Sequence, residues 1–296
     1  MSADERGRPA DAAPAGGERV DDPGRGPRGR GGWTLALDTA TPATVAAALG
    51  PDGAASARSV APRPGERPAH TRLLLALVDE VLTATGGTVA GVERIVVGLG
   101  PGTFTGIRVG VATARALALA HGARVVGVPT PWALAGAARS GGDPRRPVLV
   151  VQDARRRELF LTLFADGGPA RSDGGQAGAG SRGPGGSPGR GGDAADPALA
   201  GGPAPVTVPQ ADLAAALDRL DERPVAAVGD GAVAFAAVLR DAGIVVPEDP
   251  SAHAVDGLAL LRAAAGRPGV DPVATPDAVR PVYVRDADAV PTADRR

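Results

Sequence analysis

The stretch "GLGPGTFTGIRVGVATARALALA", residues 98–120, decides how the rest of the sequence is interpreted. The apolar run "VERIVVGLG" that leads into it is short and rich in β-branched residues, which predicts a buried strand. After the Gly-Pro-Gly turn, residues 103–122 predict a helix. Thr103 stands where a helix cap is expected, because its side chain can accept a hydrogen bond from a free N–H of the first turn. The stretch therefore predicts a strand, a glycine-rich turn and a helix.

The glycine-rich turn is not a Walker-type phosphate loop. Such a loop needs a lysine that reaches the outer phosphates, and the whole chain contains no lysine. Arg108 lies one turn too far into the expected helix to replace it. Binding of an anion at the helix start stays open, because free N–H groups and the helix dipole favour negative charge there. Thr103 can also satisfy those N–H groups by itself.

Small residues recur every four positions along the expected helix, at Gly106, Gly110, Ala114 and Ala118. This spacing places them on one face. Because glycine inside a helix costs about 1 kcal/mol relative to alanine, the two glycines indicate a close approach by another element. Either the stripe packs on the chain's own sheet, or it forms a docking face together with the helix expected from His70.

Strands and helices alternate on both sides of this stretch, which indicates an α/β protein. Residues 33–50 predict a β-hairpin and residues 70–87 a leucine-rich helix. Residues 147–165 predict a second hairpin, followed by a helix over 209–220, a strand, turn and helix over 224–243, and a helix over 254–266. Each half opens on a hairpin that carries an aspartate, Asp38 and Asp153, which suggests an internal duplication.

Three segments contain too few large apolar residues to form a core. We expect a disordered tail over 1–32, a disordered insert over 166–204 and a tail over 286–296, with an N-terminal lobe over 33–130 and a second lobe over 131–285. The insert matches a dinucleotide pattern at 178–183 and a nucleophile-elbow pattern at 185–189. We treat both as chance matches, since neither has the required strand before it and helix after it.

Composition excludes several kinds of site. With no cysteine and only three widely spaced histidines, we expect neither disulfides nor a metal site. The net charge of −1 gives no general basic face for nucleic acid, and "RRRE" at 155–158 is more typical of a solvated surface. No secretory signal or membrane span is predicted, so we expect a cytoplasmic protein.

Six segments occur in the order and approximate spacing of the bacterial TsaB family, also called YeaZ: "LALDTAT", "HTRLLLALVDEVL", "GLGPGTFTGIRVGVATARALALA", "VQDARRRELF", "VGDGA" and "PVYVRD". The chain resembles this family over residues 33–165 and 205–286. The resemblance implies a small form of the two-lobed actin/Hsp70-like (ASKHA) fold with duplicated βββαβα-type lobes. It also implies a non-catalytic partner of TsaD in forming threonylcarbamoyladenosine on tRNA next to the anticodon, with TsaE as a further partner and tRNA met only indirectly.

The family resemblance favours the docking alternative for the small-residue stripe. It implies a two-helix face that pairs with TsaD, or with a second copy of the chain when TsaD is absent. The expected interface residues are His70, Leu74, Leu77, Val78, Val81, Thr103, Phe104, Gly106, Arg108, Val109, Gly110 and Ala114.

An alternative function is an actin-like enzyme that binds or hydrolyses ATP. Its expected nucleotide-binding residues are Asp38, Thr39, Thr41, Asp153, Gly229 and Gly231. Against this, Asp38 and Asp153 can simply cap turns, and the second hairpin "QDARRREL" is charged and free of glycine. We therefore expect no cofactor of the chain's own, with ATP expected only at the interface with TsaD. A peptidase has no support, because there is no cysteine, no clustered histidine pair and no serine on a strand-to-helix elbow.

Overall fold

The computed structural model describes residues 31–63, 65–139, 146–165, 203–220, 222–265 and 279–284. Nearly all of the expected tails and insert, and both chance motifs, lie outside these residues. Within the described ranges, no helix is both long and apolar enough to cross a membrane.

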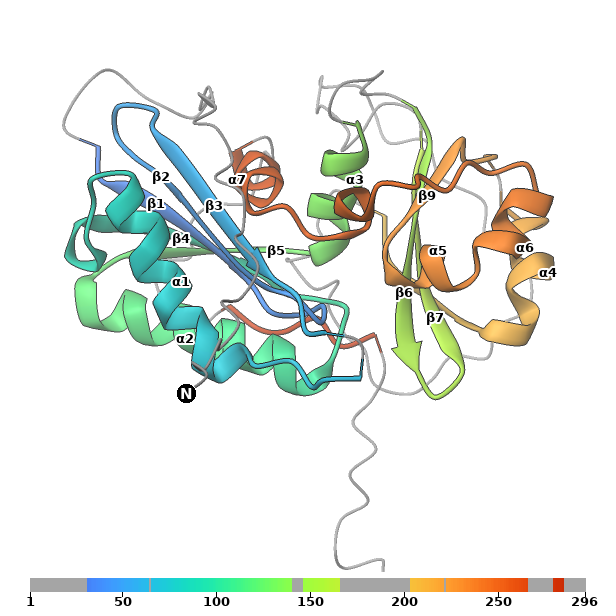
Figure 1. The fold of residues 1–296 in the computed structure, drawn as a ribbon, viewed down its shortest axis with the longest axis horizontal. Helices are drawn as coiled ribbons and strands as arrows, with labels where there is room; N and C mark the ends of the chain where they lie inside the picture. Colours follow the sequence, from blue (N-terminus) through green and yellow to red (C-terminus); the bar gives the residue numbers. More distant parts are fainter. Residues whose placement is uncertain are drawn as a thin grey trace, which may run out of the picture.

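The first sheet has the strand order β3-β2-β1-β4-β5. Its strands are β1 (Trp33–Asp38), β2 (Thr44–Leu49), β3 (Ala55–Val60), β4 (Val92–Gly98) and β5 (Arg124–Val128). The first three are antiparallel neighbours, whereas β4 runs parallel to both β1 and β5. Helix α1 (His70–Ala84), the short turn η1 (Val89–Gly91) and helix α2 (Phe104–His121) make the crossovers. Both helices cover one face of this sheet (Figure 1).

The second sheet repeats this plan, with the order β8-β7-β6-β9. Its strands are β6 (Val148–Arg155), β7 (Glu158–Phe164), β8 (Val206–Pro209) and β9 (Ala226–Val228). Strand β9 runs parallel to β6, and Val245 forms a parallel bridge to Ala226 where a fifth strand would lie. The expected duplication is confirmed. The outer face is covered by η3 (Gln210–Asp212), α4 (Leu213–Leu217), α5 (Asp230–Ala234) and α6 (Ala236–Asp241).

Two helices fill the space between the sheets, α3 (Thr130–Arg139) and α7 (Gly257–Ala265), with η4 (Pro250–His253) before α7. One apolar core includes the inner faces of both sheets and both helices, with Trp132, Leu134, Val150 and Leu260 among its members. The resulting layers alternate helix, sheet, helix, sheet, helix (Figure 1).

The C-terminal part of the chain packs on the first lobe. Helix α7 contacts every strand of the first sheet. Farther on, Val279 and Val282 are buried in the core beneath α1 and α2, and Val282 N donates to Leu99 O at 2.9 Å. The expected division into lobes 33–130 and 131–285 is therefore too simple, because these later segments complete the core of the first.

Candidate functional site

Helix α2 begins as the sequence predicts. Thr103 is its N-cap, and the Thr103 Oγ1 accepts a hydrogen bond from Gly106 N at 3.2 Å. Thr103 N donates to Ala40 O at 2.9 Å, which ties the start of the helix to the turn after β1. The cap already uses one of the free N–H groups that an anion would need.

The small-residue stripe of α2 faces the interior of this chain. Gly106, Gly110, Ala114 and Ala118 are all buried. A Cβ at Gly106 would collide with Thr39 O, and one at Gly110 would lie 2.6 Å from Thr39 Oγ1. Thr39 Oγ1 itself donates to Gly106 O at 2.7 Å. The expectation that Gly106, Gly110 and Ala114 meet a partner is wrong, because Thr39 in the turn after β1 packs against the two glycines and Ala114 is buried in the core.

The expected interface residues of α1 are core residues as well. Leu74, Leu77, Val78 and Val81 are buried in the cluster between α1, α2 and the first sheet. His70 is also buried, with its Nδ1 2.9 Å from the hydroxyl of Thr44 on β2, and this burial lowers its pKa. These five residues hold α1 on the sheet and are not available to a partner. Of the remaining expected residues, Thr103 and Val109 are half-buried, whereas Phe104 and Arg108 are exposed.

The main exposed surface of these two helices, which we call the outer α1–α2 face, shares only Phe104 and Arg108 with the expected interface. It consists of Thr71, Arg72, Leu75, Ala76, Asp79, Glu80 and Thr83 on α1, and Phe104, Thr105, Arg108, Ala112, Ala116, Leu119 and Ala120 on α2. Leu75 is 58% exposed and Leu119 82% exposed. On the exposed side of α2, small residues recur every four positions at Ala112, Ala116 and Ala120. This helix therefore carries small side chains on its exposed face as well as on its buried face.

At the N-terminal end of α2, exposed aromatic side chains cluster around Arg108. The Arg108 guanidinium carbon lies 3.7 Å from the centre of the Phe104 ring, and Arg108 Nε donates to the Tyr283 hydroxyl at 3.0 Å. The Phe104 and Tyr283 rings are 5.5 Å apart. Sequence reasoning assigned no role to Tyr283, because nothing in "PVYVRD" shows that the chain returns to α2.

The two hairpin aspartates make the same turn. Asp38 Oδ1 accepts from Ala40 N at 2.9 Å, and Asp153 Oδ1 accepts from Arg155 N at 2.8 Å. In both cases the donor is two residues further on, which defines an Asx turn. The interpretation of these aspartates as turn caps is confirmed.

Asp38 is completely buried. Its Oδ2 accepts from Thr130 Oγ1 at 2.7 Å, and Thr130 Oγ1 in turn accepts from Gly100 N at 3.2 Å. A Cβ at Gly98 would collide with this carboxyl group. Burial raises the pKa of Asp38 to about 6, against the opposing effect of the donors from Thr130 and Ala40. The carboxyl group therefore joins β1, the turn after β4 and the start of α3.

The other expected nucleotide-binding residues do not form an open cradle around Asp38. The Thr39 hydroxyl is used by Gly106 O, and Thr41 Oγ1 is buried without a hydrogen-bond partner among the described residues. A Cβ at Gly229 would collide with Val151 O, and one at Gly231 would lie 2.8 Å from the Val151 side chain. These glycines allow the turn after β9 to pack on β6. In this arrangement Thr39, Gly229 and Gly231 make contacts within the chain.

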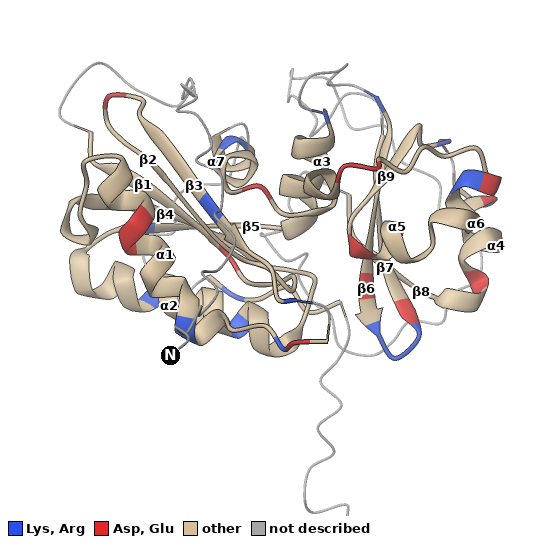
Figure 2. Ribbon diagram, in the orientation of Figure 1, with Lys and Arg blue, Asp and Glu red and all other residues tan. Residues whose placement is uncertain are grey.

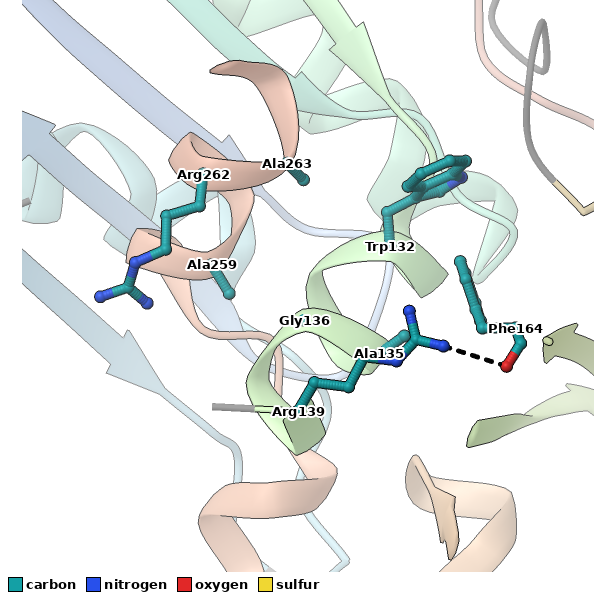
Figure 3. Close-up of a pocket in the computed structure, with 8 residues that line it drawn as sticks. All are labelled: Trp132, Ala135, Gly136, Arg139, Phe164, Ala259, Arg262 and Ala263. Carbon is teal, nitrogen blue, oxygen red and sulfur yellow. Dashed lines mark hydrogen bonds between the residues drawn. The ribbon is translucent and has the colours of Figure 1, made fainter. Parts of the chain in front are cut away.

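A cavity of about 210 Å³ opens between α3, α7 and the end of β7 (Figure 3). Its lining residues are Trp132, Ala135, Gly136, Arg139, Phe164, Ala259, Arg262 and Ala263. Phe164 pairs with Val148 at the start of β6, so the cavity lies at the opposite end of that strand from Asp153. Arg139 donates to Arg146 O at 3.0 Å and to Phe164 O at 3.1 Å, which indicates a structural role.

The three histidines lie on separate elements: His70 on α1, His121 on α2 and His253 on η4. In the part of the chain that the structure describes, no group of three or more His, Cys, Asp or Glu residues could hold a metal ion.

This architecture resembles that of solved YeaZ structures. A Pseudomonas aeruginosa protein described as similar to the peptidase YeaZ matches with a TM-score of 0.57 and 22% identity, covering 86% of this chain and all of that one (100%). A second structure, YeaZ from Pseudomonas aeruginosa, matches with a TM-score of 0.53 and 20% identity over 79% of this chain and 90% of that one. Together with the duplicated sheets, these likenesses place the chain in the class of two-lobed α/β proteins with the actin-like (ASKHA) fold.

Sequence comparison is more specific. Residues 58–175 match the model of the TsaD family, described as tRNA N6-adenosine threonylcarbamoyltransferase. The tRNA threonylcarbamoyladenosine biosynthesis protein TsaB of Escherichia coli K12 is 38% identical over 132 residues, which are 44% of this chain and 54% of that protein. The protein of the same name from Haemophilus influenzae is 33% identical over 128 residues, 43% of this chain and 52% of that one.

An uncharacterised protein of Mycobacterium tuberculosis is 39% identical over 148 residues, 46% of this chain and 63% of that protein. Over this segment the chain is similar to proteins of the TsaB/YeaZ family. The matching segment spans between about half and two thirds of the length of these relatives.

Proposed function

We propose that this chain is the non-catalytic partner of TsaD in forming threonylcarbamoyladenosine on tRNA, next to the anticodon. In this proposal TsaD transfers the threonylcarbamoyl group from its adenylate, TsaE assists, and this chain supports TsaD by docking through the outer α1–α2 face. The similarity to two curated TsaB proteins carries the proposal. It agrees with a fold in which each of the two hairpin aspartates caps a turn.

The outer α1–α2 face has the properties of a helix-packing surface. Leu75 and Leu119 are exposed apolar side chains, and exposed leucines at helix positions supply the apolar contact of a helix-to-helix interface. The exposed face of α2 carries small side chains at Ala112, Ala116 and Ala120. Such side chains would allow another helix to approach closely. A four-helix contact with the equivalent helices of TsaD would cover both features, and a second copy of this chain would cover them when TsaD is absent.

The test is a charge placed on this face. We expect Leu75→Glu combined with Ala116→Glu to fold normally, because both positions are exposed and glutamate is a good helix former. The affinity for TsaD, measured by titration calorimetry, should fall by at least about tenfold, because an unpaired charge in an apolar interface costs more than 1.4 kcal/mol. Modification of an unmodified tRNA transcript by TsaD and TsaE should fall in parallel.

The matched control is Val233→Glu, which changes an equally exposed apolar residue (56%) on α5 of the second lobe. It should leave both assays unchanged. Wild-type affinity of the double variant for TsaD would contradict the docking proposal. Tight Mg–ATP binding by the chain alone that is abolished in Asp38→Asn would instead favour an ATP-dependent enzyme.

A further inference from the structure

The charged residues of the outer α1–α2 face are separated along the two helices. Strands β3, β4 and β5 run in the same direction, so α1 and α2, which return the chain between them, run parallel to each other. Arg72 and Arg108 lie in the first two turns of α1 and α2, whereas Asp79 and Glu80 lie in the second half of α1. Figure 2 shows the acidic positions of α1 toward one end of the helix and a basic position toward the other. The face therefore has a basic end and an acidic end.

At the basic end, two aromatic side chains hold Arg108 in one orientation. Phe104 lies four residues earlier on α2, and its ring centre is 3.7 Å from the Arg108 guanidinium carbon. The Tyr283 hydroxyl accepts from Arg108 Nε at 3.0 Å. Tyr283 is placed there by its neighbour Val282, whose N donates to Leu99 O at 2.9 Å. The guanidinium group is therefore fixed although it lies at the surface.

The remaining donors of Arg108 suit a carboxylate. Among the residues that the structure describes, its Nη1 and Nη2 have no hydrogen bond or ion pair. The two terminal nitrogens of a guanidinium group can donate two parallel hydrogen bonds to one carboxylate. Because Phe104 and Tyr283 already fix the group, little side-chain freedom is left to lose on binding. Arg108 is thus preorganised for a carboxylate ligand.

TsaD has helices that can supply this carboxylate. The TsaD family model matches residues 58–175, which include α1 and α2, so we expect TsaD to carry two equivalent helices. Two such pairs that pack face to face about a two-fold axis perpendicular to the helices place the N-terminal end of each pair against the C-terminal half of the other. In this chain, that half of α1 carries Asp79 and Glu80.

We propose that Arg108 binds a carboxylate of TsaD, located on the C-terminal half of the TsaD helix that corresponds to α1. This inference rests on the proposed function and names the chemistry of the group that the docking face recognises. A protein carboxylate is favoured over an RNA phosphate for two reasons. Arg108 shares its surface with the exposed Leu75, which offers apolar contact to a helix. Asp79 on the same surface carries a negative charge that repels a phosphate backbone.

The experiment measures the affinity for TsaD after Arg108→Gln. The full-length variant should fold normally, because the position is exposed and glutamine is a good helix former. We expect the affinity, measured by titration calorimetry, to fall by about tenfold, because two charge-assisted hydrogen bonds are lost. Arg108→Lys should recover only part of this loss, since an ammonium group cannot donate the parallel pair. The difference between wild type and Arg108→Gln should shrink at high salt concentration.

Tyr283 is a positioning residue in this proposal, because it acts on TsaD through Arg108. Tyr283→Phe keeps the ring and removes the acceptor of the Arg108 Nε. It should weaken binding of TsaD by about threefold, with an unchanged melting temperature. In the Arg108→Gln background the same change should have no further effect on the affinity. An equal effect of Tyr283→Phe in both backgrounds would contradict the positioning role.

The matched control is Arg219→Gln, which removes an exposed arginine of the second lobe, directly after α4. It should change the affinity for TsaD by less than about twofold. Wild-type affinity of Arg108→Gln, or an equal loss in Arg219→Gln, would overturn the inference. Normal binding of TsaD by Arg108→Gln with weaker binding of tRNA by the complex would also overturn it, and would assign Arg108 to a phosphate.

Failure of the proposed function gives a different result. If the wild-type chain does not bind TsaD, both proposals are overturned. If Leu75→Glu with Ala116→Glu weakens binding of TsaD and Arg108→Gln does not, the docking face stands and only the carboxylate contact is overturned.

Discussion

The two glycines of α2 are required by the main chain of the segment after β1. Alanine at Gly106 would drive its Cβ into the backbone oxygen of Thr39, which cannot move away as a flexible side chain could. We expect Gly106→Ala to lower the free energy of unfolding by about 1–3 kcal/mol, since overpacking outweighs the gain in helix propensity. Urea denaturation followed by circular dichroism measures this change.

Gly136 on α3 provides the contrast. A Cβ there would meet only the Ala259 Cβ, at an ordinary 3.8 Å. Gly136→Ala should therefore stabilise the chain by about 0.5–1 kcal/mol. Equal effects of the two substitutions would show that the contact between Gly106 and Thr39 does not constrain α2.

Asp38 gives the protein a pH-dependent stability. Burial raises the pKa of Asp38 from 3.8 to about 6 in the folded state, so the folded protein binds the proton more tightly than the unfolded chain. The resulting stabilisation is complete below about pH 4 and is lost as the pH rises through 6, amounting to about 3 kcal/mol. Denaturation curves between pH 4 and pH 7 should show this loss in the wild type.

The isosteric variant Asp38→Asn serves as the control, because it keeps the oxygen that accepts from Ala40 N and has no proton to lose. Its stability should depend less on pH by the same amount. Identical pH profiles of the two proteins would show that another group is responsible.

At the scale of elements, the sequence predicts the helices and strands that have one buried face and one solvent-exposed face. Helix α1 buries residues at helical spacing and leaves the rest exposed, so its amphipathic pattern is visible in the sequence. Helix α3 lies between the two sheets and is buried on most sides, so it has no such pattern and was not predicted. Strand β3 was also missed, because it lies at a sheet edge and its sequence, ASARSV, is half polar.

The spacing of the small residues does not show which face of α2 packs against the chain's own core. Helix α2 carries small residues at intervals of four on two faces, Gly106 and Gly110 on one and Ala112 and Ala116 on the other. Both sets permit close packing, and only the position of Thr39 in space shows which one is already occupied. The capping roles of Thr103 and Asp38 were predictable, since they depend on residues near them in sequence.

At the scale of the whole molecule, residues 279–284 complete the core of the first lobe, although they lie far from it in the sequence. Val279 and Val282 fill the core beneath α1 and α2, and each buried valine contributes about 1.5 kcal/mol. Truncation after residue 278 should therefore lower the free energy of unfolding by about 3 kcal/mol or more. Thermal unfolding followed by calorimetry measures the loss.

The full chain with Tyr283→Ala is the control, because this side chain is 46% exposed. It should cost no more than about 1 kcal/mol. A truncated chain as stable as the wild type would show that these residues do not contribute to the free energy of unfolding.

Because residues 279–284 complete the core of the first lobe, they also determine when this lobe can finish packing during synthesis. The ribosome produces α1 and α2 long before Val279 and Val282, and the entire second sheet is made in between. Until those valines emerge, the first lobe has an incomplete interior and exposes apolar surface, which favours association with other chains. The first half of this protein therefore reaches its final packing only after the second half has been translated.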